Sequence, residues 1–268
     1  MTAEVQARPF VARAAATVTG RRRPHLVGEL IVVLVLLRVY DMARAHAEVR
    51  RTAALHHGQS ILDLETWLRI DVEKVANVWV TGHRLLSLVA SDVYQFAHVT
   101  VTLSVLAWCW LRRPELYRTA RNALVLINLI GLTVFLLLPV APPRLLPGGG
   151  YVDAVALAGF GASHGGPVAA DQFGALPSLH LGWAVWATVI LIRMLPRSSW
   201  TWLCWAYPVL VTTVVVVTGN HYLLDAVAGT AVALTALQLA QGRTAYLARK
   251  VRRSGPEQSL RDAQRQAA

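Results

Sequence analysis

The chain has 268 residues, of which 55% are hydrophobic and 15% are charged. An ordinary soluble domain carries roughly 25% charged residues, so this composition argues against a soluble protein and indicates an integral membrane protein. The net charge of +11 does not indicate nucleic-acid binding, because the basic residues cluster at the ends of apolar segments and do not form one continuous face.

Apolar segments predict six transmembrane helices. The longest stretches without charge, 122–143 and 198–224, exceed the roughly 20 residues that a helix needs to cross the hydrocarbon core. The first segment contains Glu29 and Arg38, and the fourth is short, so these two are the weaker predictions. In chain order, the six predicted spans are 26–40, 93–111, 122–143, 179–192, 198–224 and 226–242.

Basic residues between the spans predict the topology. With six spans, four groups rich in arginine fall on one side, which the positive-inside rule makes the cytoplasm. We therefore expect the protein in the cytoplasmic membrane with both termini inside. The four groups are the basic N-terminus 1–25, the loops 112–121 and 193–197, and the basic tail 243–268.

Two long segments are expected on the outer side of the membrane domain, which spans 26–242. Residues 46–90 mix apolar and charged side chains at helical spacing, which favours one or two helices at the outer interface; a small soluble cap is the alternative. Residues 140–178 are rich in Gly and Pro, and long loops of this kind are commonly lids or binding loops. The predicted fold is therefore all-α: a polytopic membrane protein with six transmembrane helices and outer interfacial helices.

Two histidines and an aspartate are expected at the outer ends of the fourth and sixth spans. Pro177 and Ser178 are common helix-start residues, so His180 is predicted in the first turn of its helix. His221 is predicted in the first turn of the sixth span, with Asp225 four residues later on the same face. A carboxylate that accepts a hydrogen bond from Nδ1 leaves Nε2 unprotonated. This pattern favours His221 as a nucleophile that forms a phosphohistidine and His180 as the general acid and base.

Arg144 follows the third span and is expected beside the two histidines. Its planar guanidinium can donate two hydrogen bonds to one phosphate, and the N–H groups at two helix N-termini would add further donors. Ser178, Asn220 and Tyr222 flank the histidines in sequence, and we expect them to contact the phosphate or the substrate. No cofactor is expected.

Other functions could use the same polar residues. Two histidines and a carboxylate can form a facial triad around a metal ion, but Arg144 would repel a cation, so no metal is predicted. His and Asp within a membrane can also relay protons in a transporter, although the two halves of the chain lack the similarity that repeats produce. A buried polar pair that only holds two helices together is a further alternative.

Three short motifs resemble those of the type 2 phosphatidic acid phosphatase superfamily, which comprises lipid phosphatases and phosphotransferases. The motifs are "APPRLLP" (141–147), "PSLH" (177–180) and "GNHYLLDAVAG" (219–229). The resemblance covers about 92–242 and implies a six-helix membrane core.

The resemblance also implies roles for the matching residues. In that family, His221 would be the nucleophile, His180 the acid and base, Asp225 the residue that orients His221, and Arg144 a phosphate ligand. These roles agree with those argued from the residues themselves.

This chain departs from the family pattern at positions that bear on the identity of the substrate. Leu137 and Val215 stand where the family has basic residues, and Leu179 stands where its second motif has glycine. The pattern is closer to the branch that includes inositol phosphorylceramide synthase, whose members transfer a phosphoryl-polar group to another alcohol.

The sequence thus predicts a lipid phosphate phosphatase that cleaves a phosphoester or diphosphate at the outer membrane face. The alternative is a phosphotransferase that moves a phosphoryl-polar headgroup between lipids or alcohols. The expected partners are a lipid phosphate substrate and the membrane. The headgroup, the lipid chain and the oligomeric state stay open at this point.

Overall fold

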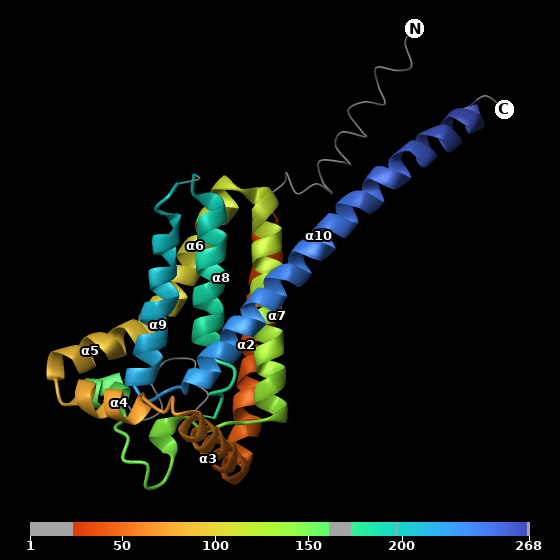
Figure 1. The fold of residues 1–268 in the computed structure, drawn as a ribbon. Helices are drawn as coiled ribbons and strands as arrows, with labels where there is room; N and C mark the ends of the chain where they lie inside the picture. The colour runs from red at the N-terminus through yellow and green to blue at the C-terminus, as the bar shows by residue number, and fades with distance from the viewer. Residues whose placement is uncertain (1–23, 161–172, 197, 267–268) are drawn as a thin grey trace.

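The computed structural model describes residues 24–160, 173–196 and 198–266 (Figure 1). The basic N-terminus 1–25 therefore lies almost entirely outside the described residues, as does the part 161–172 of the outer loop. Regular structure in the described ranges is helical, apart from an isolated β-bridge between Val140 and Gly174. The predicted all-α fold is confirmed.

In the described ranges, six helices form a bundle, and three further helices lie at one of its ends (Figure 1). Each bundle helix overlaps one of the six predicted spans, although α7 begins at Pro114, inside the predicted basic loop 112–121, and α10 continues beyond residue 242 into the predicted tail. Helices α7 and α8 pack along α10, and α2 packs against α7. The bundle helices are α2 (Leu26–Val49), α6 (His98–Arg112), α7 (Pro114–Leu137), α8 (Leu179–Met194), α9 (Ala206–Val217) and α10 (Leu223–Gln266); the helices at its end are α3 (Arg51–Leu68), α4 (Glu73–Thr81) and α5 (Arg84–Asp92).

Short helical turns connect these helices. The π-turn η1 (Val93–Ala97) joins α5 to α6, and the 3-10 turn η4 (Thr201–Trp205) leads into α9. The long connection between α7 and α8 contains η2 (Pro143–Leu145) and η3 (Ala156–Phe160). The start of α2 at Leu26 and the far end of α10 lie away from α3 and α4, toward the opposite end of the bundle (Figure 1). This arrangement is consistent with the predicted placement of both termini on one side.

Small residues allow the bundle helices to pack closely. Ala120 and Ala123 of α7 lie in one buried cluster with Ala233 and Ala236 of α10. Alanine at such positions lets helix backbones approach each other, as is common between membrane helices. Trp186 of α8 fills the same cluster and donates its indole N–H to Ala120 O at 2.8 Å. The core therefore fixes α8 and α10 relative to α7.

Glu29, a charged residue in the first predicted span, is paired across the bundle. Its Oε1 lies 2.6 Å from Nη1 of Arg121, and its Oε2 accepts a hydrogen bond from the Tyr117 hydroxyl at 3.0 Å. Charged side chains are tolerated within membranes when they are paired in this way. The contact holds α2 against α7 at the end of the bundle opposite to α3.

Two helical segments within the described ranges are long and apolar enough to cross a membrane by themselves. They are Pro114–Leu137 in α7 and Leu223–Tyr246 in α10. The apolar helices Leu179–Met194 and Thr201–Val217 are shorter. That all six bundle helices cross the membrane therefore stays a prediction.

Large apolar side chains are exposed on the sides of the bundle. Leu34 on α2, Leu103 on α6, Val209 on α9 and Leu239 on α10 are all more than half exposed, at 55% to 66%. Soluble proteins rarely expose apolar side chains on so many faces. This surface supports the placement of the bundle in lipid.

Residues 46–90 contain three helices after the end of α2, where the sequence predicts one or two. Helix α3 ends at Arg69, whose backbone is left-handed with φ of 59°. Helix α4 ends before His83, whose backbone is extended. Arg69 is not a typical helix terminator, whereas Gly82, the C-cap of α4, is a typical stop residue, so the sequence held a signal for the second break alone.

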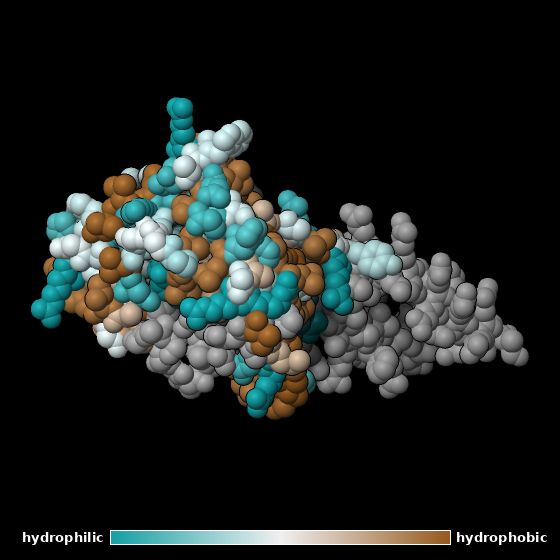
Figure 2. Space-filling view, turned by 90° about the horizontal axis from the view of Figure 1, so that it is seen from below, coloured by the Kyte–Doolittle hydropathy of each residue, from teal (hydrophilic) through white to brown (hydrophobic). Residues whose placement is uncertain are grey.

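The end of the bundle that carries α3 and α4 has a mixed surface. Seen from that end, hydrophilic and hydrophobic side chains are interspersed (Figure 2). The exposed apolar side chains of α3–α5 include Trp67, Val75, Trp79 and Leu85. Such a mixture of exposed aromatic, aliphatic and charged side chains suits helices that lie at a membrane interface.

Helix α8 begins in close contact with α10 at Gly229. A Cβ atom added at Gly229 would lie 2.2 Å from the carbonyl oxygen of Ser178. Gly229→Ala should therefore lower the free energy of unfolding by about 1–3 kcal/mol, as overpacked sites do. Thermal unfolding of the purified protein in detergent measures the change.

Gly242 on the same helix provides the matched control, because nothing lies within 4 Å of an added Cβ atom there. Gly242→Ala should leave the melting temperature unchanged or raise it, since alanine favours a helix over glycine by about 1 kcal/mol. Equal melting temperatures for the two variants would contradict the close packing at Gly229.

Candidate active site

Three segments that are distant in sequence meet at the end of the bundle beside α3 and α4 (Figure 1). Backbone hydrogen bonds join them. Arg144 N donates to Gly219 O at 3.0 Å, and Ser178 N donates to Asp225 O at 3.0 Å. The loop after α7, the start of α8 and the turn before α10 are therefore held together as one unit.

His221 lies in the turn immediately before α10, because the helix begins at Leu223; the predicted position in the first helical turn is wrong by two residues. Its Nδ1 lies 2.9 Å from Ala175 O and 3.3 Å from Oδ2 of Asp225. A carbonyl and an ionised carboxylate only accept hydrogen bonds, so Nδ1 carries the proton. Nε2 then has a free lone pair, which is the tautomer that a nucleophilic histidine requires.

His180 lies in the first turn of α8, as the sequence predicts. Ser178 caps this helix by accepting a hydrogen bond from Leu181 N at 3.4 Å. Nδ1 of His180 is 3.3 Å from Nε2 of His221. Because Nε2 of His221 is the acceptor in its tautomer, Nδ1 of His180 is the donor in this contact.

Aromatic rings hold the imidazole of His180. The Tyr94 ring stacks on it with centroids 4.6 Å apart, and the His98 ring meets it edge-on at 4.3 Å. Nδ1 of His98 is 3.0 Å from Tyr94 O, so the two neighbours also support each other. The η1–α6 segment thus forms one wall of the histidine pair.

Asp225 is fully buried and binds on the far side of His221 from His180. Its Oδ2 also accepts a hydrogen bond from Tyr222 N at 2.9 Å. Asp225 faces Nδ1 of His221, whereas His180 faces Nε2, so the three side chains cannot surround one metal ion. In the part of the chain that the structure describes, no group of three or more His, Cys, Asp or Glu side chains is placed to hold a metal.

Arg144 is anchored beside His221 by two side chains. Its Nε donates to Oδ2 of Asp153 at 3.1 Å, and its Nη1 donates to Oδ1 of Asn220 in a short contact. The side chain of Arg144 is only 4% exposed. A guanidinium has five donors, so these contacts can fix its orientation while other N–H groups bind an anion.

The remaining predicted residues have structural contacts. Ser178 caps α8, and the amide group of Asn220 donates to the Thr218 hydroxyl at 2.9 Å while it accepts from Arg144. The Tyr222 side chain is fully buried, and its hydroxyl donates to Ala141 O at 3.0 Å. Tyr222 therefore supports the loop that carries Arg144, and its predicted contact with substrate stays a prediction.

A family comparison matches residues 59–239 to the PAP2 superfamily. The chain belongs to the PAP2 superfamily. This family comprises phosphoesterases and phosphotransferases, which supports an enzyme that acts on phosphates. Comparison with curated proteins and with solved structures gave no match.

The departures from the PAP2 pattern have structural explanations. Leu137 ends α7 with its side chain 71% exposed, so it does not face the histidines. Val215 is fully buried, and its carbonyl accepts hydrogen bonds from both Asn220 N and His221 N. Leu179 packs against Gly131, where an added Cβ atom would lie 2.6 Å from a Leu179 methyl group. Val215 and Leu179 thus serve packing, whereas the exposed Leu137 lies away from the histidines.

Carboxylates occupy the N-terminus of α10. Leu223 N donates to Oε1 of Glu73 at 3.0 Å, and Leu224 N donates to Oε1 of Glu65 at 2.7 Å. Asp225 accepts from Tyr222 N, as described above. The expectation that these N–H groups of α10 bind the phosphate is therefore wrong for this helix, because protein side chains already satisfy them.

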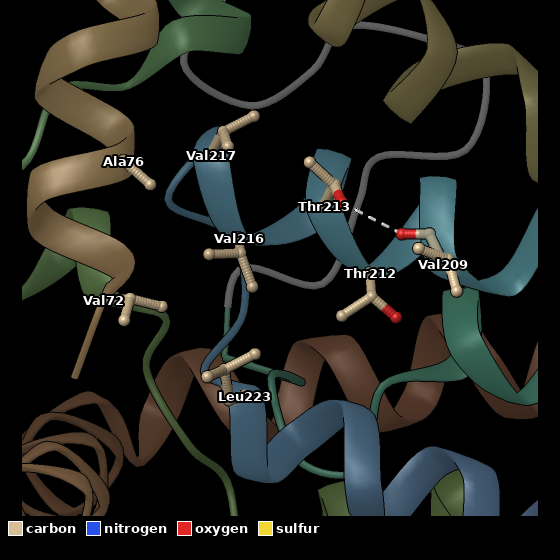
Figure 3. A pocket seen from close by; sticks show the side chains of 8 residues that line it. All are labelled: Val72, Ala76, Val209, Thr212, Thr213, Val216, Val217 and Leu223. Carbon is tan, nitrogen blue, oxygen red and sulfur yellow. Dashed lines mark hydrogen bonds between the residues drawn. The ribbon is translucent and has the colours of Figure 1, made fainter. Parts of the chain in front are cut away.

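An apolar groove lies near this helix start, between α4 and α9 (Figure 3). Its volume is about 340 Å³. The hydroxyls of Thr212 and Thr213 donate to carbonyls one turn earlier in α9, so the lining has no polar group directed at a ligand. The groove is thus unsuited to a phosphate. The lining residues are Val72, Ala76, Val209, Thr212, Thr213, Val216, Val217 and Leu223.

Sequence reasoning missed several residues around the site. Asp153 lies in the long outer loop and gave no signal of its own. Glu65 follows the buried positions Ala54 and Gly58 of α3 at helical spacing, and Glu73 shares a buried face of α4 with Asn77. Acidic side chains in register with a buried helix face are unusual. The helical spacing of these acidic residues from buried positions was the signal in the sequence that could have revealed them.

Asn220→Ala should weaken binding of inorganic phosphate, because Arg144 loses one of the two side chains that orient it. We expect the inhibition constant of phosphate to rise by about 10-fold, because this factor corresponds to the loss of roughly one charge-assisted hydrogen bond. Competition against hydrolysis of a phosphate monoester measures it.

Asn122→Ala is the matched control. The Asn122 side chain also accepts from an arginine, at 2.7 Å from Nη2 of Arg121, but it lies at the opposite end of the bundle. The inhibition constant should be unchanged in this variant. A wild-type inhibition constant in Asn220→Ala would show that Asn220 does not orient Arg144 for phosphate binding.

Proposed function

We propose that this PAP2 superfamily member is an integral membrane lipid phosphate phosphatase. It cleaves a phosphoester or diphosphate of a lipid substrate at the outer membrane face through a phosphohistidine. The observation that carries the proposal is the 3.3 Å contact between Nε2 of His221 and Nδ1 of His180, with the opposite nitrogen of His221 bound by Ala175 O and Asp225.

The first step is nucleophilic attack. The Nε2 lone pair of His221 attacks phosphorus, and the bond from phosphorus to the leaving oxygen breaks. His180, which carries protons on both ring nitrogens at this step, gives its Nδ1 proton to that oxygen and becomes a neutral imidazole, so the alcohol or phosphate leaves in its protonated form. Positive charge that develops on His221 is stabilised by Asp225 and by Ala175 O at Nδ1.

The second step reverses these roles. His180, now unprotonated at Nδ1, removes a proton from water, and the water oxygen attacks phosphorus. The bond between phosphorus and Nε2 of His221 breaks, inorganic phosphate leaves, and both histidines return to their starting state. Arg144 balances the phosphoryl charge in both steps.

Two features of the protein surface support a lipid substrate and an outer location of the site. Exposed leucine and valine side chains on the sides of the bundle suit lipid, and the starts of α8 and α10, which carry the histidine pair, lie at the end opposite to the start of α2 (Figure 1). By the positive-inside rule, that end faces away from the cytoplasm. We therefore place the enzyme in the cytoplasmic membrane, with both termini inside.

A phosphotransferase is the second candidate. The three motifs "APPRLLP", "PSLH" and "GNHYLLD" together resemble the branch that includes inositol phosphorylceramide synthase. In this reaction His180 would deprotonate an alcohol of another lipid instead of water. The chemistry up to the phosphohistidine would be the same.

Thin-layer analysis with a labelled lipid phosphate separates the two functions. A phosphatase releases labelled inorganic phosphate whether or not an acceptor alcohol is present. An obligatory phosphotransferase gives a labelled product lipid only when the acceptor is added. Release of phosphate without acceptor therefore supports the phosphatase.

Substitutions test the roles of the three site residues. His221→Ala and His180→Ala should each abolish turnover and keep the melting temperature near that of the wild type. Asp225→Asn should lower turnover by less than the roughly 10⁴-fold that loss of the correct tautomer causes in a catalytic triad, because Ala175 O still accepts from Nδ1. Steady-state turnover measures all three.

His56→Ala is the control for the histidine series, since His56 is an exposed residue of α3. It should keep wild-type turnover. Wild-type turnover in His221→Ala would eliminate this residue as the nucleophile.

Chelation separates the proposed chemistry from metal catalysis. No step above uses a metal, so turnover should be unchanged after incubation with EDTA and dialysis. Loss of turnover that one divalent ion restores would instead support a metal-dependent reaction.

A further inference from the structure

Two glutamates from different helices meet in the interior next to the proposed active site. The side chains of Glu65 in α3 and Glu73 in α4 are fully buried. Each uses Oε1 to accept a hydrogen bond from one of two consecutive N–H groups, Leu223 N and Leu224 N, at the start of α10. Buried carboxylates are costly unless they are paired, so this arrangement calls for an explanation.

Neither Oε2 of the two carboxyl groups has a hydrogen-bond donor among the described residues. The two side chains lie close enough for Glu73 to raise the pKa of Glu65. Two ionised carboxylates cannot form a hydrogen bond, because both only accept. A single proton held by one carboxyl group would let it donate to the other.

The pair acts on the turn that contains His221. Leu223 is two residues after His221, and Asp225, which binds Nδ1 of His221, lies in the same first turn of α10. We propose that Glu65 and Glu73 share one proton and together position His221 through the first N–H groups of α10. They are positioning residues, since neither contacts the histidine. The inference rests on the proposed function of His221.

The charges around the pair oppose loss of the shared proton. Burial, the hydrogen bond to Glu73 and the nearby charges of Glu73 and Asp225 outweigh the hydrogen bond from Leu224 N, and they raise the pKa of Glu65 to about 8. Tyr151 of the outer loop also faces the pair: burial and the charges of both glutamates and Asp71 raise its pKa to about 12. Tyr222 of the turn lies near both glutamates as well.

The basic side chain next in sequence, Lys74, lies against Gly150 of the outer loop. It does not hydrogen-bond to either glutamate. The pair therefore has acidic and phenolic groups as its neighbours in α10 and the outer loop.

Loss of the proton leaves two carboxylates in contact and forces them apart. The pKa of Glu65 is raised in the folded protein, so its stabilising contribution is complete below pH 4.5 and is lost as the pH rises to about 8. Separation of the carboxylates pulls Leu223 N and Leu224 N out of position. Turnover should therefore fall on the alkaline side with an apparent pKa of about 8.

Glu65→Gln tests the shared proton. A glutamine amide can accept from Leu224 N with its oxygen and donate permanently to Glu73 with its nitrogen. This variant should keep turnover at neutral pH, and its alkaline limb should move up by about one pH unit or more. Glu65→Ala removes both contacts and should lower turnover by about 10- to 100-fold with little change in KM.

Asp63→Asn is the matched control, because Asp63 is an exposed carboxylate on the same helix that binds Gln59. Its pH profile should equal that of the wild type. An unchanged alkaline limb in Glu65→Gln would overturn the proposal, and so would wild-type turnover in Glu65→Ala. The glutamine variant decides the question even where the alanine variant fails to fold.

Two measurements do not depend on turnover. Infrared difference spectra between about pH 6 and about pH 10 should show a buried protonated carboxyl in the wild type and lose it in Glu65→Gln. The nitrogen-15 NMR signal of His221, assigned with His221→Ala, should shift over the same pH range. Absence of either signal in the wild type would refute the shared proton and its effect on His221. Failure of hydrolysis with both signals present would refute the proposed function alone.

Discussion

The hydrogen bonds at Nδ1 of His221 are the constraint on which the site depends. Ala175 O and Asp225 both accept at this nitrogen, so the proton is fixed there and the lone pair at Nε2 is fixed toward His180. The two acceptors come from different segments. Ala175 precedes α8, and Asp225 begins α10, so the tautomer is correct only when these helices are packed together. Assembly of the bundle and activation of the imidazole are therefore the same event.

Close helix packing makes this assembly possible. Gly229 lets the start of α8 touch α10, and buried alanines bring α7 and α10 together. The acidic groups of α3 and α4 then satisfy the first N–H groups of α10. The outer helices are thus part of the support for the catalytic turn. Their role is structural and electrostatic, in addition to any contact with the membrane surface.

The sequence predicted the six bundle helices and the juxtaposition of Arg144, His180 and His221, because hydropathy and short motifs are local signals. It did not predict that His221 precedes its helix, since that position depends on Gly219, whose φ is positive at 72°, and on hydrogen bonds to Val215 O. It also missed Glu65 and Glu73. Their burial depends on contacts about 150 residues away in sequence, at the start of α10.

Arg144 is joined to His221 through the two residues that precede this histidine. Its backbone N–H binds Gly219 O, and its side chain binds Asn220, the two residues that precede His221. The spacing between guanidinium and imidazole therefore does not depend on the tilt of α7 against α10. Membrane helices tilt to match bilayers of different thickness. A site built in this way can keep its internal distances while the surrounding helices adapt to the lipid in which they lie.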